Sequence, residues 1–288
     1  MRGTVLFVIN PIAGGHPVEP LLEAVKNWGE RLDASSRHYL TTGKADEANI
    51  REIIENEKVG TLVAVGGDGT LQMAANLCRQ YHLLLGHIPR GSANGMAEEL
   101  ALPGELPAAF ARLEKGVTRP CDMICFDGQH YGFHISDLGL NAALVRYFEE
   151  SGRRGFLAYA SGVSQVLWQQ APFRAHLRMD GSQFAYTSLM IALANARHYG
   201  TGAALNSVGQ PDDGRFEVCV LHELSFSKVT RHFLDLLDED SPHLSLHQCR
   251  KLEVQLNVPQ PFQIDGEVMG ARKRLVVEVV PGCVEMIV

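Results

Sequence analysis

The alternation of short apolar runs with helix-patterned segments over the first 120 residues constrains this fold more than any other feature. Residues 5–9 are apolar at every position, which is typical of a strand covered on both faces. Residues 18–32 then repeat apolar side chains at helical spacing. Strands that alternate with helices form parallel sheets with helices on their faces. The same pattern predicts further strands at 38–41, 61–65 and 83–88 and further helices at 46–56, 70–81 and 93–100.

Near residue 120 the pattern changes to alternating strands separated by Asp-Gly pairs. Such a pair is a frequent centre of a two-residue hairpin turn, and four occur here: Asp127-Gly128, Asp180-Gly181, Asp213-Gly214 and Asp265-Gly266. Strands are predicted at 123–126, 131–135, 175–179, 186–194, 216–221, 252–256 and 275–280, and helices at 156–169 and 225–237. We therefore predict an α/β domain with a parallel sheet over residues 1–122 and a β-rich domain, a sandwich or a barrel, over residues 123–288.

Composition excludes several classes of protein. The chain has 288 residues, of which 45% are hydrophobic, as in ordinary globular proteins. Its 26 Lys and Arg residues are outnumbered by 33 Asp and Glu residues, so the net charge of −7 provides no basic field for a nucleic acid. No apolar run approaches the roughly 18 residues of a membrane-spanning helix. We expect a cytoplasmic protein whose contact with membranes is peripheral and transient.

The six cysteines are scattered along the chain, and none belongs to a Cys-x-x-Cys pair. A chain of this length does not need disulfides to stabilise its core. We therefore predict reduced thiols and no structural metal.

A glycine-rich motif, Gly66-Gly67-Asp68-Gly69-Thr70, lies between a predicted strand and a predicted helix. Turns at the carboxyl ends of parallel strands are where such folds bind ligands. Glycines let backbone N–H groups approach a polyphosphate, and the start of the next helix attracts negative charge. The motif lacks the Gly-Lys-Ser/Thr ending of a Walker loop. A glycine-rich turn capped by Thr70 is the structural alternative.

Two more turns follow strands of the same predicted sheet. Asn10-Pro11, with Gly14-Gly15 shortly after it, follows the first strand, and residues 89–95 (Pro-Arg-Gly-Ser-Ala-Asn-Gly) follow the fourth. Each alone is weak evidence, because Asn-Pro and Gly-Gly are common in turns. Three turns with small polar residues at one edge of a sheet favour a single binding site.

This set of motifs resembles, in its order along the chain, that of the diacylglycerol kinase catalytic-domain family, which includes bacterial lipid kinases, sphingosine kinases and ceramide kinases. The matching segments are Asn10-Pro11, residues 66–70, Pro89-x-Gly91-Ser92-x-Asn94, Asp213-Gly214 and Asp265-Gly266-Glu267. The resemblance implies an N-terminal nucleotide-binding domain similar to those of NAD kinase and phosphofructokinase, and a C-terminal β-sandwich domain for the lipid substrate. It also implies transfer of the γ-phosphoryl group of ATP, with Mg²⁺, to a lipid hydroxyl in the cleft between the two.

The resemblance further implies roles for individual residues. Asp68 is expected to help hold the metal and the phosphates, and Thr42 is the alternative to Thr41 as a nucleotide contact. The implied ATP contacts are Asn10, Thr41, Gly66, Gly67, Asp68, Gly69, Thr70, Leu71, Gln72, Ser92 and Asn94.

Two carboxylates of the second half complete the implied site. Asp213 resembles the carboxylate of a magnesium site built otherwise from backbone carbonyls, which places Gln210 and Arg215 next to the ion; oxygen ligands suit this cation. Asp213 also fits a hairpin turn that needs no ligand. Glu267 matches the proton acceptor proposed for the family, with Asp265 close by, and a solvated hairpin tip is the alternative.

Two departures from the family pattern leave the acceptor open. Many bacterial diacylglycerol kinases carry Thr-x-Asn-Asp where this chain has Ser92-Ala93-Asn94-Gly95, a form similar to the sphingosine-kinase branch. The chain also has only local basic clusters, such as Arg153-Arg154 and Arg272-Lys273-Arg274, which fit a solvated face. Diacylglycerol or a sphingoid base is the expected acceptor. An NAD kinase-like enzyme and a non-catalytic lipid- or nucleotide-binding protein are the alternatives, and the oligomeric state, a homodimer included, is open.

Overall fold

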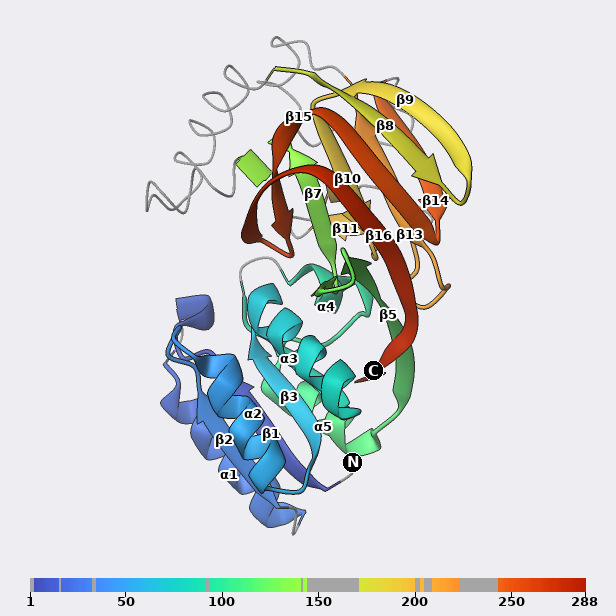
Figure 1. Cartoon of the computed structure of the whole chain (residues 1–288). Coiled ribbons are helices and arrows are strands. Elements are labelled where there is room, and N and C mark those ends of the chain that lie inside the picture. The colour runs from blue at the N-terminus through green and yellow to red at the C-terminus, as the bar shows by residue number, and fades with distance from the viewer. Residues whose placement is uncertain are drawn as a thin grey trace. The chain divides into compact units, whose positions relative to one another are not determined.

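The computed structural model describes residues 3–15, 17–32, 35–91, 94–140, 142–143, 171–199, 203–204, 209–222 and 243–288 (Figure 1). The chain divides into two compact units. The first comprises Met1–Cys121 and Gly282–Val288, and the second comprises Asp122–Pro281. The helices predicted at 156–169 and 225–237 lie outside the described residues.

The first unit is built on a parallel sheet, as predicted. Its strands lie in the order β2 (Ser36–Leu40), β1 (Thr4–Ile9), β3 (Val59–Gly66) and β4 (Leu84–Pro89). The last residues of β16 (Glu267–Ile287) pair with β4 in the same direction. Every residue from Val5 to Ile9 is buried, because both faces of the sheet are covered.

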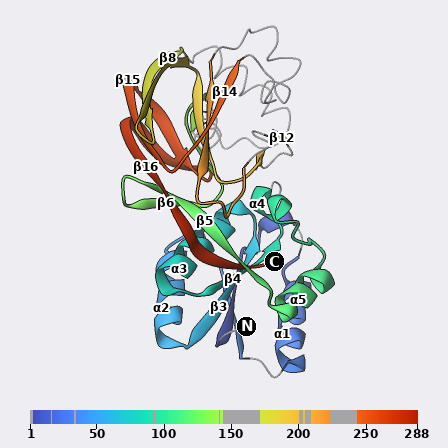
Figure 2. The same ribbon diagram turned by 90° about the vertical axis from the view of Figure 1, so that its right-hand side faces the viewer.

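Helices cover the two faces of this sheet. Figure 2 shows α1 (Glu19–Arg31) and α5 (Leu106–Lys115) on one face and α2 (Asp46–Asn56) and α3 (Asp68–Tyr81) on the other. An aromatic cluster of Phe7, Trp28 and Phe110 lies between the sheet and the first pair of helices, with ring centroids 5.4 to 6.2 Å apart. Helix α4 (Gly95–Glu99) is a short helix after β4, shorter than the predicted segment 93–100.

The order of the strands decides which loops meet. Strand β1 lies between β2 and β3, so the chain passes to one side of β1 and later returns to the other. The helices that follow β1 and β3 accordingly lie on opposite faces (Figure 2). In open α/β sheets, ligands bind where the strand order reverses, at the carboxyl ends of the strands. Asn10 and Gly67 follow the two strands at this point.

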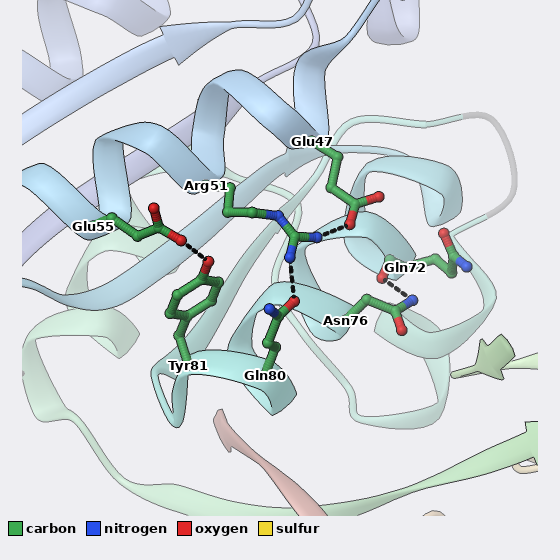
Figure 3. A network of polar contacts seen from close by, with 7 residues as sticks. All are labelled: Glu47, Arg51, Glu55, Gln72, Asn76, Gln80 and Tyr81. Carbon is green, nitrogen blue, oxygen red and sulfur yellow. Dashed lines mark hydrogen bonds and ion pairs between the residues drawn. The ribbon is translucent and has the colours of Figure 1, made fainter. Parts of the chain in front are cut away.

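Helices α2 and α3 are joined by polar side chains on their outer surface (Figure 3). Arg51 forms an ion pair with Glu47 at 2.6 Å and donates to Gln80 at 2.8 Å. The hydroxyl of Tyr81 donates to the Glu55 carboxylate. Exposed pairs of this kind contribute little to stability. They orient α3, the helix that begins in the glycine-rich motif, against its neighbour.

A buried arginine fastens the C-terminal residues to the first unit. Arg112 of α5 donates to the carbonyl of Ile287 at 3.1 Å and to the carbonyl of His87 in β4. Burial lowers the pKa of Arg112 to about 10, so the guanidinium stays charged at neutral pH. The division predicted from sequence, at residues 122 and 123, places Gly282–Val288 in the second domain. These residues instead belong to the first unit, because they pair with β4 and accept from Arg112.

The second unit is a β-sandwich of antiparallel strands. One series runs in the order β14 (Leu244–Cys249), β13 (Phe216–Leu221), β10 (Met190–Ala194), β7 (Ile135–Gly139), β15 (Lys251–Ile264) and β16. Strand β8 (Phe173–Met179) pairs with β15 and with β9 (Ser182–Ser188), and β5 (Thr118–Phe126) pairs with β6 (His130–Gly132). Strands β11 (His198–Tyr199) and β12 (Ala203–Ala204) form a separate pair.

The core of this unit comes from the alternating inner positions of its strands. Its larger members include Phe126, Phe173, Phe216 and Phe262, all fully buried. The strand predicted at 186–194 is interrupted at Ser188, where the chain passes from β9 to β10 and the Ser188 hydroxyl donates to the Leu221 carbonyl at 2.8 Å. The sandwich alternative of the predicted β-rich domain is therefore the one observed.

All six cysteines are free thiols. Burial raises the pKa of the Cys249 thiol to about 12 and that of Cys78 well above its ordinary value, so neither ionises at neutral pH. Among the described residues, no helix is long and apolar enough to cross a membrane.

Candidate functional site

Two loops of the first unit are in backbone contact at the carboxyl edge of its sheet. The N–H of Arg90, after β4, donates to the carbonyl of Gly66, at the end of β3, at 2.8 Å. A Cβ atom added at Gly91 would lie 2.5 Å from the Cα of Gly67, closer than real contacts allow. Glycine is thus required where the two loops meet. At Gly66 a Cβ would lie 2.4 Å from the Thr70 hydroxyl, so the glycine lets α3 begin directly after the strand.

Asn10 and Thr41 lie at the same edge. The N–H of Asn10 donates to the carbonyl of Val65 at 2.9 Å, and the N–H of Thr41 donates to the carbonyl of Ile9 at 2.8 Å. These bonds extend the pairing of β1 with its two neighbours by one residue. The structure therefore brings Asn10, Thr41 and the glycine-rich motif together. The start of α3, a helix of 14 residues, lies at this edge, and the first N–H groups of a helix favour an anion.

Thr42 has a different role from Thr41. Its N–H and its hydroxyl donate to the Asp46 carboxylate at 2.8 and 3.0 Å, and the N–H of Gly43 donates to the same carboxylate at 2.7 Å. These bonds close the turn that leads into α2. Thr41 therefore remains the preferred of the two threonines as a ligand contact.

Asp68 carries the unsatisfied oxygen of this edge. It is the first residue of α3, and its Oδ1 atom is buried with no hydrogen-bond partner among the described residues. Leaving a buried carboxylate oxygen unpaired is costly unless a cation or a donor binds there. The donor chemistry of Asp68 thus fits a magnesium ion held with nucleotide phosphates.

Three of the predicted ATP contacts have local roles or lie outside the described residues, and they stay predictions. The Asn94 side chain accepts from the N–H of Gly91 at 2.8 Å and donates to the carbonyl of the same residue at 2.7 Å, so it shapes its own loop. The Leu71 side chain is buried, and its N–H donates to the carbonyl of Gly67. Ser92 lies outside the described residues. Gln72 is half-buried on α3, and its carbonyl accepts from the Asn76 side chain at 3.1 Å (Figure 3).

In the second unit, Asp265 is held at the tip between β15 and β16. Its two carboxylate oxygens accept from the N–H groups of Phe133 at 2.6 Å and His134 at 2.9 Å. Burial raises the pKa of Asp265 to about 6, although these two hydrogen bonds and the charge of His134 act in the opposite direction. The group thus titrates near the pH at which a general base works best.

A buried amide supports the Asp265 turn from below. The side chain of Gln263 donates to the carboxylate of Asp137, and its Oε1 accepts from the N–H of Gly266 at 2.6 Å. The other Asp137 oxygen accepts from the N–H of Ala142 at 2.7 Å. Gln263 and Asp137 are 2% and 0% exposed, so this network is protected from water.

Glu267 differs from Asp265 in its exposure and in its hydrogen bonds. It is exposed at the first position of β16, whereas Asp265 is partly buried and bonded at both oxygens. The sequence-based assignment of Glu267 as the proton acceptor is not tested by these contacts and stays a prediction. The geometry favours Asp265.

Asp213 lies in a second acidic turn of the same unit. One carboxylate oxygen accepts from the N–H of Arg215 at 2.9 Å and the other accepts from the Gln248 amide at 2.8 Å. These bonds are sufficient for a hairpin turn. Gln210 is exposed and Arg215 half-buried beside it. Their magnesium role stays a prediction, and in the part of the chain that the structure describes no three His, Cys, Asp or Glu side chains gather as a metal site.

A buried asparagine links the two acidic turns. The amide of Asn195 donates to the carbonyls of Asp122 at 2.8 Å and Phe133 at 3.0 Å. Asp122 accepts from the N–H of Gly214 at 2.7 Å, and Phe133 donates to Asp265. The turns that contain Asp213 and Asp265 are therefore fastened to one buried side chain.

Sequence reasoning missed these supporting residues. The polar members of the network are Asp122, Asp137, Asn195 and Gln263. Each interrupts an otherwise apolar strand or strand end, as Gln263 does between Phe262 and Ile264. A polar residue at a buried strand position was the available signal.

Comparisons with known proteins agree with this arrangement of an α/β unit followed by a β-sandwich. The family model "Diacylglycerol kinase catalytic domain" matches residues 4–126, and the model "YegS C-terminal NAD kinase beta sandwich-like domain" matches residues 136–288. The fold and the matched domains define a lipid kinase-type protein. The chain belongs to the diacylglycerol kinase catalytic-domain family, in the branch of the YegS-like lipid kinases.

Individual relatives span most of the chain. A protein from Stenotrophomonas maltophilia named "Probable lipid kinase YegS-like" is 30% identical over 97% of this chain and 94% of its own length. The chain spans 65% of the uncharacterized protein sll0036 from Synechocystis, at 26% identity over 92% of this chain. The crystal structure of a diacylglycerol kinase from Bacillus anthracis has the same fold, with a TM-score of 0.76 and 17% identity over 99% of this chain and 96% of that one.

Proposed function

We propose that this protein transfers the γ-phosphoryl group of ATP to a hydroxyl of a membrane lipid such as diacylglycerol or a sphingoid base. Membership of a lipid kinase family supports the class of reaction. The observation that carries the proposal for this chain is the buried, unpaired Asp68 oxygen at the start of α3, beside two loops in glycine-to-glycine contact.

The first unit would hold the nucleotide. The N–H groups at the start of α3 would bind phosphate oxygens, and a Cβ added at Gly69 would meet nothing within 4 Å, so this position is open. Asn10 and Thr41 would contact the nucleotide from the neighbouring loops. Asp68 would hold Mg²⁺, which in phosphoryl transfer neutralises charge that develops on the phosphate oxygens.

The second unit would provide the proton acceptor. We assign this role to Asp265 in preference to Glu267, because Asp265 is oriented by two N–H donors and its pKa is raised by burial. Asp265 would take the proton from the attacking lipid hydroxyl as its oxygen bonds to phosphorus. Glu267 would remain exposed to water at the start of β16.

The test is ATP turnover by the Asp68→Asn variant with a total lipid extract, Mg²⁺ and labelled ATP, with labelled products identified by mass spectrometry. The substitution preserves shape and removes the charge, so we expect turnover to fall by about 10²-fold or more. Glu47→Gln is the matched control, because Glu47 occupies the first turn of the neighbouring helix α2 and is exposed. Full turnover by a folded Asp68→Asn variant contradicts the proposal. Preferred phosphorylation of NAD instead assigns an NAD kinase-like activity.

A further inference from the structure

An irregularity in the hairpin of β15 and β16 gives the second unit a protruding segment. Gln255 pairs with Arg274 and Gln260 pairs with Arg272, so the four residues 256–259 of β15 lie opposite the single residue Lys273 of β16. Such an insertion bends the strand and breaks its pairing locally. Three of the inserted residues, Asn257, Val258 and Pro259, are exposed. We call residues 257–259 the bulge tip.

Two of the three exposed residues of the bulge tip are apolar. Val258 is 46% exposed and is followed by the exposed Pro259. The side chain of Asn257 accepts from the N–H of Arg174, in β8, at 2.8 Å and so ties the tip to the neighbouring strand. The apolar tip is therefore fixed in place rather than attached through the hairpin alone.

Basic side chains surround the bulge tip. Arg272, Lys273 and Arg274 lie directly across the hairpin from it. Arg174 and His176 lie on the outer face of β8, where alternate residues point away from the core. Within the stretches 171–177, 182–188, 254–262 and 270–277, the sequence contains no Asp or Glu. This local concentration of positive charge contrasts with the net charge of −7 of the whole chain.

Acidic residues lie further along the strands and in the turn between β5 and β6, where the Asp127 carboxylate accepts from the N–H of Val276 at 2.9 Å. Glu253 lies opposite Arg178, and Glu278 forms an ion pair with Lys251 at 2.5 Å. The side chain of Arg274 donates to the neutral amide of Gln255. Among the described residues, no ion pair involves Arg174, Arg272, Lys273 or Arg274. Their charge is thus available to an external partner.

We propose that the bulge tip and its basic surround bind the surface of an anionic lipid bilayer. Exposed cations attract anionic headgroups, and a small apolar tip inserts at the level of the headgroups. A bilayer accepts both chemistries at once, whereas a soluble polyanion uses only the charge. The inference rests on the proposed function, because a lipid kinase must reach a substrate that resides in a membrane. The basic surface would allow this although the chain has a net negative charge.

Vesicle sedimentation tests the proposal. The whole protein should sediment with vesicles of phosphatidylcholine in which about 30% of the lipid is the anionic phosphatidylglycerol. It should sediment much less with vesicles of phosphatidylcholine alone. Binding should weaken with salt, because the Debye length falls from about 10 Å at 0.1 M to about 3 Å at 1 M. A variant with Arg272→Glu, Lys273→Glu and Arg274→Glu should lose at least about 100-fold in partitioning, because removal of each positive charge alone costs about fivefold and the new carboxylates add repulsion.

A control variant carries the same change of charge elsewhere. Lys26→Glu, Lys58→Glu and Lys115→Glu alter three exposed lysines of the first unit, and this variant should bind as the unmodified protein does. The milder Arg272→Gln, Lys273→Gln, Arg274→Gln variant guards against misfolding, with circular dichroism as the check. Equal losses in the basic-surround and control variants, or no loss in the former, overturn the proposal.

A second readout reports insertion of the tip. In Val258→Trp the indole emission should shift to shorter wavelength with anionic vesicles, and Val258→Ser should weaken binding several-fold. If the protein binds heparin as tightly as it binds vesicles, and Val258→Ser has no effect, the partner of this surface is a soluble polyanion and the proposal is contradicted. Turnover of a short-chain lipid dispersed as monomers should be unchanged in the basic-surround variant. If the unmodified protein does not phosphorylate the short-chain lipid, the proposed function is contradicted and the vesicle result still stands.

Discussion

Two Asp-Gly turns of the second unit have nearly the same backbone and different surroundings. Asp180 and Gly181 have φ angles of 46° and 90°, and Asp265 and Gly266 have φ angles of 48° and 90°. Each aspartate accepts from two consecutive backbone N–H groups of another segment: Arg250 and Lys251 for Asp180, and Phe133 and His134 for Asp265. Both glycines accommodate a left-handed conformation that favours hairpin turns.

The two turns differ in what lies beneath them. Asp180 is exposed. Asp265 is partly buried above the Gln263 and Asp137 side chains, and burial raises the pKa of its carboxyl to about 6. The Asp-Gly pair thus specifies the shape of a turn. The buried polar residues around it determine whether its carboxylate is suited to proton transfer.

The largest expected effect is on kcat, and it should distinguish the Asp265 turn from the Asp180 turn. Asp265→Asn should lower kcat by about 10²–10⁴-fold, the usual contribution of a general base, with little change in ATP affinity. Asp180→Asn alters the same kind of turn and should leave kcat within about twofold, because surface changes of this kind are nearly neutral. Steady-state kinetics of both variants, together with Glu267→Gln, provide the measurement. A collapse of kcat only in Glu267→Gln returns the base assignment to Glu267.

The pH dependence gives an independent check on the same residue. A base must be deprotonated, so kcat/KM should rise with pH and level off above about pH 6. The folded state also binds this proton more tightly than the unfolded chain, whose carboxyl has a pKa of 3.8. The resulting stability is complete below pH 3.8 and is lost as the pH rises through about 6. Asp265→Asn should remove that loss from the Tm profile, whereas Asp180→Asn should retain it.

An intermediate effect is expected from the amide beneath the turn. Gln263→Leu leaves the Asp137 carboxylate and the Gly266 N–H without their partner, so it should lower the free energy of unfolding by about 1–3 kcal/mol. It should also lower kcat about tenfold, because the turn loses its orientation. Gln80→Leu is the matched control: that amide accepts from Arg51 at the surface, and its loss should change stability very little.

Denaturant unfolding and kcat measured on both glutamine variants decide the matter. If both variants lose the same free energy of unfolding, burial of the Asp265 network adds no more stability than an ordinary surface contact does. A Gln263→Leu variant with unchanged kcat and reduced stability would assign Gln263 a structural role alone.

Sequence patterns predicted the first unit well because its elements are determined by local periodicity. The parallel sheet, its strand ends and the glycine-rich edge all follow from continuous apolar runs and from turn residues. Helix α5 was missed, although Leu106, Ala109, Phe110 and Leu113 repeat at helical spacing, because the nearby Pro103 and Pro107 resemble a loop. Proline in the first turn of a helix is in fact favourable.

The parts that could not be predicted depend on contacts between distant segments. Nothing local indicates that the last seven residues pair with β4 of the first unit, since a strand pattern does not identify its partner strand. The same holds for Asn195, whose amide bonds carbonyls 73 and 62 positions earlier in the chain. Family resemblance located Asp265 and Glu267 in one motif, but only burial and hydrogen bonding distinguish them.

The smallest expected effect concerns Asp213, the carboxylate with the most ordinary surroundings. It is exposed and satisfied by Arg215 and Gln248, so Asp213→Ala should cost about 1 kcal/mol or less of stability. If Asp213 also contributes an oxygen to magnesium, the variant should need several-fold more Mg²⁺ for half-maximal rate. Its kcat at saturating Mg²⁺ should change little, because the other ligands that the family resemblance implies are backbone carbonyls, which the substitution leaves in place. Gln248→Leu removes one of the same hydrogen bonds, together with the bond from Gln248 to Glu217, and it leaves the Asp213 carboxylate in place, so it is the control. A Mg²⁺ titration that is shifted in Asp213→Ala and not in Gln248→Leu supports a metal ligand, because loss of turn structure alone would move both. Identical titrations leave Asp213 with the role that its two hydrogen bonds already explain.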